Sequence, residues 1–162
     1  TKRYQPLRSR ITNSYTQRKI VKINWDYQVA LIILYDSQNR LLLQHRTKDA
    51  RLLPDHWAFF GGGLNKDETP LEAVKRESLE EINYQAVNPE FFSEQPFKES
   101  KTEGYLYIFI EAFNKNKSTL TLNEGQGWGW FKDTEIDQLK MIDRDRQIVN
   151  SIFNHLKNAS IR

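Results

Sequence analysis

The chain has 162 residues, 28% of them charged and 12% aromatic, with a formal net charge of +3 and no cysteine. Such a length favours a single domain with a sizeable core and leaves too little room for two full domains. The lack of cysteine excludes disulfides, zinc–thiolate sites and thiol catalysis. No apolar run approaches the length of a membrane span, and no apolar signal segment is visible, so we expect a cytoplasmic protein without a membrane partner.

Residues 1–22 form a basic segment that contains no acidic residue. We expect a solvated N-terminal arm here, either separate from the domain or part of it, and one domain over residues 23–162. Contact of this arm with nucleic acid or an anionic substrate is an alternative that the pattern does not favour. The basic residues are Lys2, Arg3, Arg8, Arg10, Arg18, Lys19 and Lys22.

The next segments predict paired strands. Residues 27–36 are apolar at both odd and even positions, which is typical of a central strand buried on both faces. A turn at residues 37–39 leads to a pairing strand over 40–46. A polar loop with one proline follows at 47–56, and residues 57–63 predict a short strand that ends in glycines.

A helix is predicted after these glycines. Thr69 is a good N-cap, Pro70 suits the first helical position, and Glu72 would complete a capping box. Asn83 is expected to end the helix, because asparagine tolerates the left-handed backbone conformation.

The second half of the chain alternates strands and helices. Strands are predicted over residues 90–97, 104–113 and 128–131, and helices over 133–139 and 143–158. With the central helix these elements predict an α/β fold in which a mixed β-sheet lies between helices.

The central helix carries an unusual group of carboxylates. At roughly 100° per residue, Glu77, Glu80 and Glu81 fall on one side, next to the apolar stripe that should pack on the sheet. Like charges at this spacing repel each other, so the group destabilises the helix unless something neutralises it. One interpretation is a solvated acidic surface. The other is a site for divalent cations that hold a polyphosphate, since Mg²⁺ prefers carboxylate oxygens.

Residues 62–84 resemble the Nudix box, G-x5-E-x7-R-E-U-x-E-E-x-G-U, where U is apolar. The matching residues are Gly62, Glu68, Arg76, Glu77, Glu80 and Glu81. Three positions depart from the pattern: Ser78 takes an apolar slot, Asn83 replaces the second glycine, and Tyr84 is bulkier than usual. None of the three departures removes a carboxylate.

The resemblance implies a Nudix-type α/β/α sandwich and the hydrolysis of a nucleoside diphosphate linked to a group X, with Mg²⁺ or Mn²⁺ as cofactor. Water would attack phosphorus, and Glu77 would act as the general base. Arg76 and Glu68 would orient the glutamates. The metal ligands implied by the match are Glu77, Glu80, Glu81 and the main-chain carbonyl of Gly61.

Three further features lie at or beyond the box. Glu124 belongs to an E-G-Q segment that resembles the one in MutT-type enzymes, which supplies a further metal-binding carboxylate; taken alone, it is a solvated loop residue. Arg46 could bind phosphate, or be an ordinary surface arginine. Gly62 and Gly63 would let the backbone approach the substrate closely.

The E-G-Q segment and the compact length favour a MutT-like nucleoside triphosphate pyrophosphohydrolase. A nucleotide-sugar hydrolase, acting for example on ADP-ribose or a GDP-sugar, is the alternative. A Nudix-fold binding domain without activity is disfavoured because every box glutamate is present. The expected partner is a small-molecule nucleotide, and the chain is expected to be a monomer or homodimer. The histidines show no metal-ligand spacing, and most of Tyr105, Tyr107, Trp128 and Trp130 are expected in the core.

Overall fold

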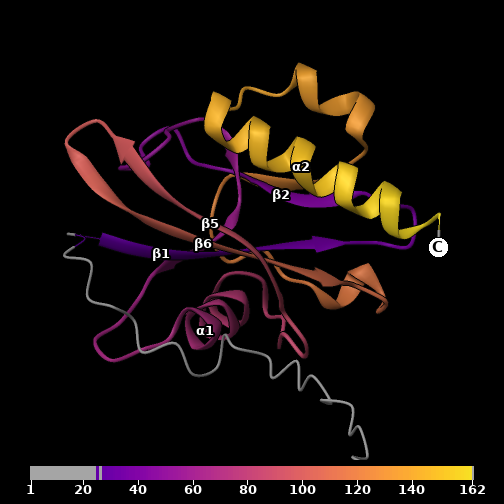
Figure 1. Ribbon diagram of the computed structural model, residues 1–162, viewed down its shortest axis with the longest axis horizontal. Helices are drawn as coiled ribbons and strands as arrows, with labels where there is room; N and C mark the ends of the chain where they lie inside the picture. The colour runs from indigo at the N-terminus through magenta and orange to yellow at the C-terminus, as the bar shows by residue number, and fades with distance from the viewer. Residues whose placement is uncertain (1–24, 26, 162) are drawn as a thin grey trace, which may run out of the picture.

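The computed structural model describes residue 25 and residues 27–161; the basic arm predicted over residues 1–22 lies outside them. The elements follow one another in the predicted alternation of strands and helices (Figure 1). They are β1 (Tyr27–Tyr35), β2 (Leu41–His45), β3 (Trp57–Ala58), β4 (Phe60–Gly63), α1 (Pro70–Ile82), β5 (Glu90–Glu99), β6 (Thr102–Ala112), the 3-10 helix η1 (Lys117–Thr119), β7 (Gly127–Phe131), the 3-10 helix η2 (Asp133–Gln138) and α2 (Asp143–Ala159).

The strands form one seven-stranded mixed sheet with β1 at its centre. The order along its main path is β3-β2-β1-β6-β5, while β4 also pairs with β1 and β7 with β2. β1 runs parallel to β6 along its whole length and antiparallel to β2 and β4. The predicted mixed sheet is therefore confirmed.

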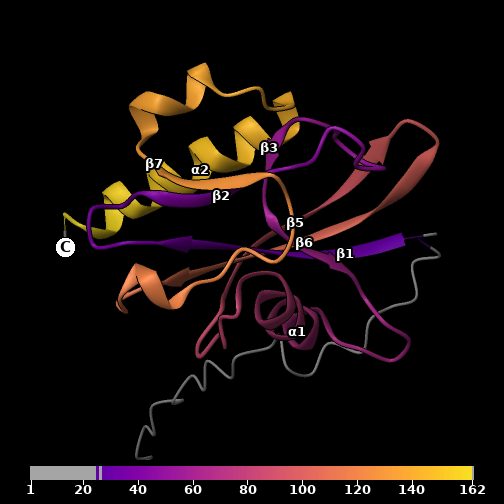
Figure 2. The ribbon, with the colours of Figure 1, turned by 180° about the vertical axis from the view of Figure 1, so that it is seen from behind.

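Helices cover both faces of this sheet, with α1 on one side and α2 with η2 on the other (Figures 1 and 2). β1 alternates between the two layers. Ala30 and Ile32 pack in the core cluster under α1, whereas Val29 and Ile33 pack in the cluster that α2 completes. Since both faces of β1 are buried, the strand is apolar at odd and even positions alike.

The ends of α1 follow the predicted chemistry. The Thr69 hydroxyl accepts the Glu72 backbone N–H at 3.2 Å, and the Glu72 carboxylate accepts the Thr69 N–H at 2.8 Å. Asn83 ends the helix with φ 52°, in the left-handed region that the box pattern normally assigns to glycine. These two caps set where α1 begins and ends.

Two predicted elements differ in detail. The strand predicted over residues 57–63 is two short strands, because the chain changes partner at Phe59: β3 pairs with β2, and β4 pairs with β1. The helix predicted over 133–139 is the 3-10 helix η2, closed by bonds such as Glu135 N–H to Lys132 O at 3.1 Å. Short helical segments commonly adopt this tighter form.

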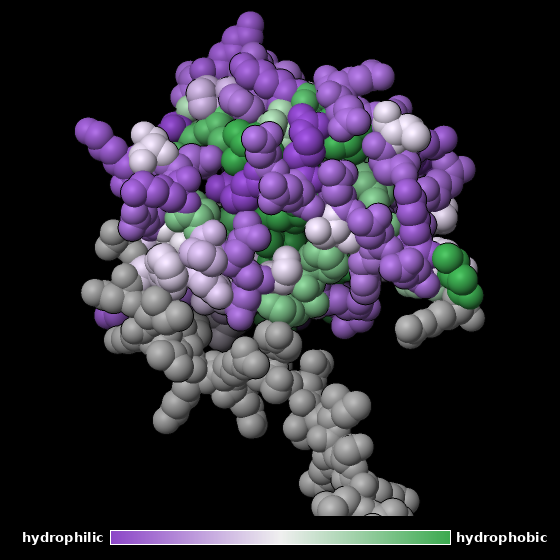
Figure 3. Space-filling model, turned by 45° about the horizontal axis from the view of Figure 1, so that its top comes forward, coloured by the Kyte–Doolittle hydropathy of each residue, from purple (hydrophilic) through white to green (hydrophobic). Residues whose placement is uncertain are grey.

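The face seen in Figure 3 is largely polar, with apolar side chains visible between the polar ones near its centre. Within the described part of the chain, no helix is both long and apolar enough to cross a membrane.

Candidate active site

A cavity of about 260 Å³ lies between the end of β4, the second half of α1 and the first turn of α2. One end is acidic, because the side chains of Glu77, Glu81 and Glu124 line it together with the backbone of Gly61 and Gly62. Three of the four predicted carboxylate ligands therefore share one cavity. They come from two segments, α1 and the loop before β7.

Glu81 is the most deeply buried of these acids, at 4% exposure. Its Oε2 accepts the backbone N–H of Gly61 at 3.1 Å. Burial raises the pKa of the Glu81 carboxyl to about 9, and repulsion from Glu124 and Glu77 adds to the shift, which the Gly61 hydrogen bond only partly opposes. The ionised form of Glu81 therefore lacks a compensating positive charge unless a cation binds beside it.

The glycines shape this end of the cavity. Gly61 has φ 133°, and a Cβ there would lie 2.1 Å from the carbonyl oxygen of Ala30, so only glycine fits. A Cβ on Gly62 would lie 2.6 Å from Glu77 Oε1. The backbone at Gly62 therefore leaves the space that the Glu77 carboxylate occupies.

Arg76 ties the neighbouring box residues together. Its Nε donates to Glu68 Oε1 at 2.8 Å, and its Nη1 donates to Glu77 Oε1 at 2.6 Å and to Glu80 Oε2 at 3.3 Å. Its Nη2 donates to the Gly63 carbonyl at 3.0 Å. The hydrogen bond from Arg76 lowers the pKa of the Glu68 carboxyl, which stays ionised. Arg76 thus bridges Glu68 and Glu77.

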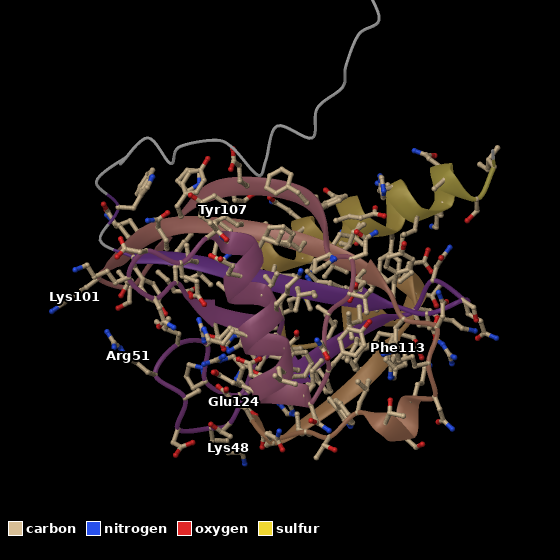
Figure 4. All side chains as sticks on the ribbon, turned by 90° about the horizontal axis from the view of Figure 1, so that it is seen from below. Lys48, Arg51, Lys101, Tyr107, Phe113 and Glu124 are labelled. Carbon is tan, nitrogen blue, oxygen red and sulfur yellow. The ribbon has the colours of Figure 1, made fainter. Side chains whose placement is uncertain are left out.

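Glu124 is held over the cavity by its neighbours in the chain. The Asn123 N–H donates to the Glu81 carbonyl at 2.8 Å, and the Gln126 N–H donates to the His45 carbonyl at 2.9 Å. Gly125 between them has φ 92°. The E-G-Q segment is thereby anchored to the end of α1 on one side and to β2 on the other, and Glu124 lies near the end of α1 (Figure 4).

Gln126 also fixes the loop that carries Arg46. Its side-chain amide donates to the Arg46 carbonyl at 2.8 Å and to Asp55 Oδ1 at 2.9 Å. Arg46 Nε donates to the Leu52 carbonyl at 2.7 Å, and the side chain lines the cavity. A role for the glutamine was missing from the sequence interpretation, because its partners lie far away in the chain.

Another part of the cavity lining was not predicted from the sequence. Phe97 and Leu106 form an apolar part of the cavity wall. Polar groups nearby in the lining come from Glu99, Arg144 and Asp145. Asp145 is 1% exposed and accepts from Arg144 Nε at 3.0 Å. Burial raises the pKa of the Asp145 carboxyl to about 6, although Arg144 opposes the shift. An acidic residue in the first turn of a helix is usually explained by its favourable interaction with the helix dipole. The sequence pattern therefore did not indicate that Asp145 lines the cavity.

Some predicted site residues lie outside the cavity. Glu80 is 59% exposed and contacts Arg76, and Glu68 and Gly63 are bound to Arg76 without lining the cavity. Trp128 and Trp130 pack against the core cluster under α1, as expected for core aromatic residues. The residues brought to the cavity are Arg46, Gly61, Gly62, Glu77, Glu81 and Glu124.

Across the described residues, no three acidic or histidine side chains converge on one point as a complete metal shell. The chemistry of the donors nevertheless fits a hard divalent cation, because a buried carboxylate faces two further carboxylates in a cavity. Side-chain rotation, water and substrate oxygens would have to complete the shell.

Comparison with known proteins agrees with the fold. The MutT protein of Methanosarcina mazei Go1 superposes with a TM-score of 0.71 at 19% identity, covering 81% of this chain and 95% of that one. The dihydroneopterin triphosphate pyrophosphohydrolase of E. coli has a TM-score of 0.67 at 19% identity, covering 79% and 95%. The Nudix domain of Shewanella oneidensis NrtR, complexed with ADP ribose, has a TM-score of 0.68 at 12% identity, covering 80% and 87%.

At these identities the solved structures establish the shared fold. The family model for the NUDIX domain matches residues 26–152, which is most of the chain and includes the box, the E-G-Q segment and the start of α2. The chain belongs to the Nudix family.

Proposed function

We propose that this protein hydrolyses a nucleoside diphosphate linked to a group X in a metal-dependent reaction, and that it acts as a MutT-like nucleoside triphosphate pyrophosphohydrolase. The observation that carries the proposal is the convergence of Glu77, Glu81 and Glu124 on one cavity. A buried carboxylate with a strongly raised pKa and like-charged neighbours is typical of a functional site.

The metal would be held by Glu77, Glu81 and Glu124, with Glu80 and the Gly61 carbonyl as further donors. When bound, Mg²⁺ or Mn²⁺ polarises phosphoryl oxygens and makes water a better nucleophile. Glu77 is the proposed base that takes the proton from the attacking water. Arg76 orients this carboxylate through its bond to Oε1 at 2.6 Å, and Arg46 offers a guanidinium to a phosphate in the cavity.

The E-G-Q segment supports a nucleoside triphosphate as substrate, because it resembles the segment of MutT-type nucleoside triphosphate pyrophosphohydrolases and its Glu124 lines the same cavity as Glu81. Hydrolysis of a nucleotide sugar such as ADP-ribose or a GDP-sugar is the alternative for the same site. A binding domain without activity has no need of a complete acidic cavity, so the retained carboxylates argue against it.

The decisive experiment incubates the purified protein with nucleoside triphosphates, ADP-ribose and GDP-sugars in the presence of Mg²⁺, and separates the products by chromatography. We expect nucleoside monophosphate and pyrophosphate from a triphosphate. EDTA should stop the reaction, and added Mg²⁺ or Mn²⁺ should restore it.

The matched variants for this experiment are Glu77→Gln and, as a control, Glu90→Gln, which removes an exposed carboxylate outside the cavity. Full turnover in EDTA would refute metal dependence. Turnover of nucleotide sugars alone would select the alternative substrate class, and binding of nucleotides without turnover would make the protein a ligand-binding domain.

A further inference from the structure

A second cavity, of about 470 Å³, lies next to the first. The two share Tyr27, Arg46 and Leu52 as lining residues, so they are adjacent. The second cavity is enclosed by the loop after β2, which supplies Arg51, and by the turn between β5 and β6, which supplies Lys101. The proposed hydrolysis assigns a role to Arg46 but none to Arg51 or Lys101.

The second cavity is predominantly cationic. Arg51 and Lys101 are exposed, and neither side chain makes a hydrogen bond or ion pair with another described residue. They lie on the same side of the molecule (Figure 4). The acid that lines the cavity, Glu103, is already paired with Lys98 at 2.8 Å. Two cations from separate loops therefore line an open space without a counter-ion among the described residues.

The two cavities together form a path along which the sign of the charge changes. The carboxylates of Glu77, Glu81 and Glu124 lie at one end, Arg46 lies at the junction, and Arg51 and Lys101 lie at the other end. A substrate whose diphosphate sits at the carboxylate end through metal ions can extend past Arg46 into the cationic cavity.

We propose that the second cavity binds an anionic group carried by X, so that the protein selects substrates whose X ends in phosphate. This inference rests on the proposed function and names its substrate class. A terminal phosphate would gain charge-assisted hydrogen bonds from Arg51 and Lys101. A neutral sugar in the same place would leave both cations with water and gain little. The cavity therefore favours a triphosphate over a nucleotide linked to a neutral hexose.

The first test measures binding alone, with inorganic triphosphate and Mg²⁺ in a calorimeter. The double variant Arg51→Gln/Lys101→Gln should bind about tenfold more weakly than the wild type, which corresponds to losing two partly exposed charge contacts. The control Lys48→Gln/Lys75→Gln removes two exposed lysines that do not line either cavity. Equal losses in both double variants, or no binding by the wild type, would overturn the inference.

The second test measures turnover of a nucleoside triphosphate and of a nucleotide linked to a neutral hexose. Arg51→Gln/Lys101→Gln should raise KM for the triphosphate about tenfold and leave kcat/KM for the hexose compound within about twofold. A parallel loss on both substrates would contradict selection by this cavity. If the wild type turns over neither compound while triphosphate binding still depends on Arg51 and Lys101, the proposed hydrolysis fails and the anion site stands.

Discussion

Two carboxylates of this protein have almost equally small exposed fractions, and yet their pKa values are shifted in opposite directions. Asp36, at the end of β1, is 6% exposed, and Glu81, near the end of α1, is 4% exposed. Burial alone would raise both pKa values. Hydrogen bonds from Lys117 at 2.7 Å and from Arg40 at 2.8 Å outweigh it at Asp36 and lower its pKa to about 2. At Glu81 burial raises the pKa to about 9, because repulsion from Glu124 and Glu77 adds to the effect of burial and a single backbone hydrogen bond opposes it.

The difference shows that burial does not decide whether a carboxylate is structural or functional. Asp36 has its counter-charges built into the fold, from Arg40 in the β1–β2 turn and from Lys117 in η1, so its anionic form is already compensated. Glu81 has one backbone donor and two like charges, so its anionic form requires a cation that the chain does not supply. The following experiments test this contrast.

The largest expected effect is on catalysis. Glu81→Gln should slow hydrolysis by roughly 10²–10⁴-fold, since metal-assisted catalysis contributes several kcal/mol to the barrier. Steady-state kinetics at saturating Mg²⁺ provide the measurement. Asp36→Asn, assayed at a temperature where it remains folded, should keep most of the activity. If Glu81→Gln and Asp36→Asn lose similar amounts of activity, the functional distinction between Glu81 and Asp36 is wrong.

The next effect concerns stability without substrate. The Glu81 carboxyl titrates near 4.5 in the unfolded chain and near 9 in the folded one, so between these values the folded state holds a proton that the unfolded state has lost. The free energy of unfolding should therefore fall as pH rises across this window in EDTA. Mg²⁺ at a hundredfold excess over its Kd should restore about 2.7 kcal/mol.

Thermal unfolding of the wild type and Glu81→Gln, with and without Mg²⁺ at constant ionic strength, measures this effect. The variant should be less sensitive to pH and to Mg²⁺. If millimolar Mg²⁺ at pH 8 does not change the melting temperature of the wild type, the cation binds only together with the substrate phosphates.

Asp36 should show the opposite dependence on pH. Its folded pKa lies below the unfolded value of 3.8, so its stabilisation is present above that value and is lost as pH falls through about 2. The shift corresponds to about 2 kcal/mol at neutral pH. Asp36→Asn should lose this amount in urea unfolding at pH 7, and the gap to the wild type should narrow below pH 4. A gap that is constant with pH would assign the effect to packing.

The smallest expected effect belongs to Glu124. Glu124→Gln should lower kcat by roughly tenfold, or about 1.4 kcal/mol, and change the free energy of unfolding by less than about 0.5 kcal/mol, as for most exposed substitutions. Kinetics across a range of Mg²⁺ concentrations, paired with urea unfolding, separate the two quantities. If Glu124→Gln shows wild-type kinetics at every Mg²⁺ concentration, Glu124 is an ordinary solvated loop residue.

The sequence predicted the parts of this protein that are encoded locally. The two-sided apolar pattern of residues 27–36 identified the central strand, and Thr69, Glu72 and Asn83 marked the ends of α1. The spacing of the box glutamates also identified two carboxylates of the cavity. Each of these signals lies within one element or a single turn, so it is visible without knowledge of the fold.

Contacts between distant segments were not predictable in the same way. Asp145 reaches the cavity only because α2 crosses the sheet opposite α1, and Gln126 meets Asp55 only after β7 pairs with β2. The partner change at Phe59 likewise depends on where β1 and β2 lie. The cationic cavity needs a loop and a hairpin turn to come together, and each contributes a single exposed basic residue that is unremarkable in sequence.

The parallel pairing of β1 with β6 has a consequence for how the protein folds. Parallel strands cannot be joined by a tight turn, and here α1 and β5 both lie in the connection. This long-range pairing closes a large loop, and such contacts form late and slow folding. Because α1 lies between β1 and β6 in the chain, its acidic residues reach their final positions only when these two strands pair. Refolding followed by recovery of activity should therefore show a single slow phase shared with the burial of β1, with no active species that precedes the complete sheet.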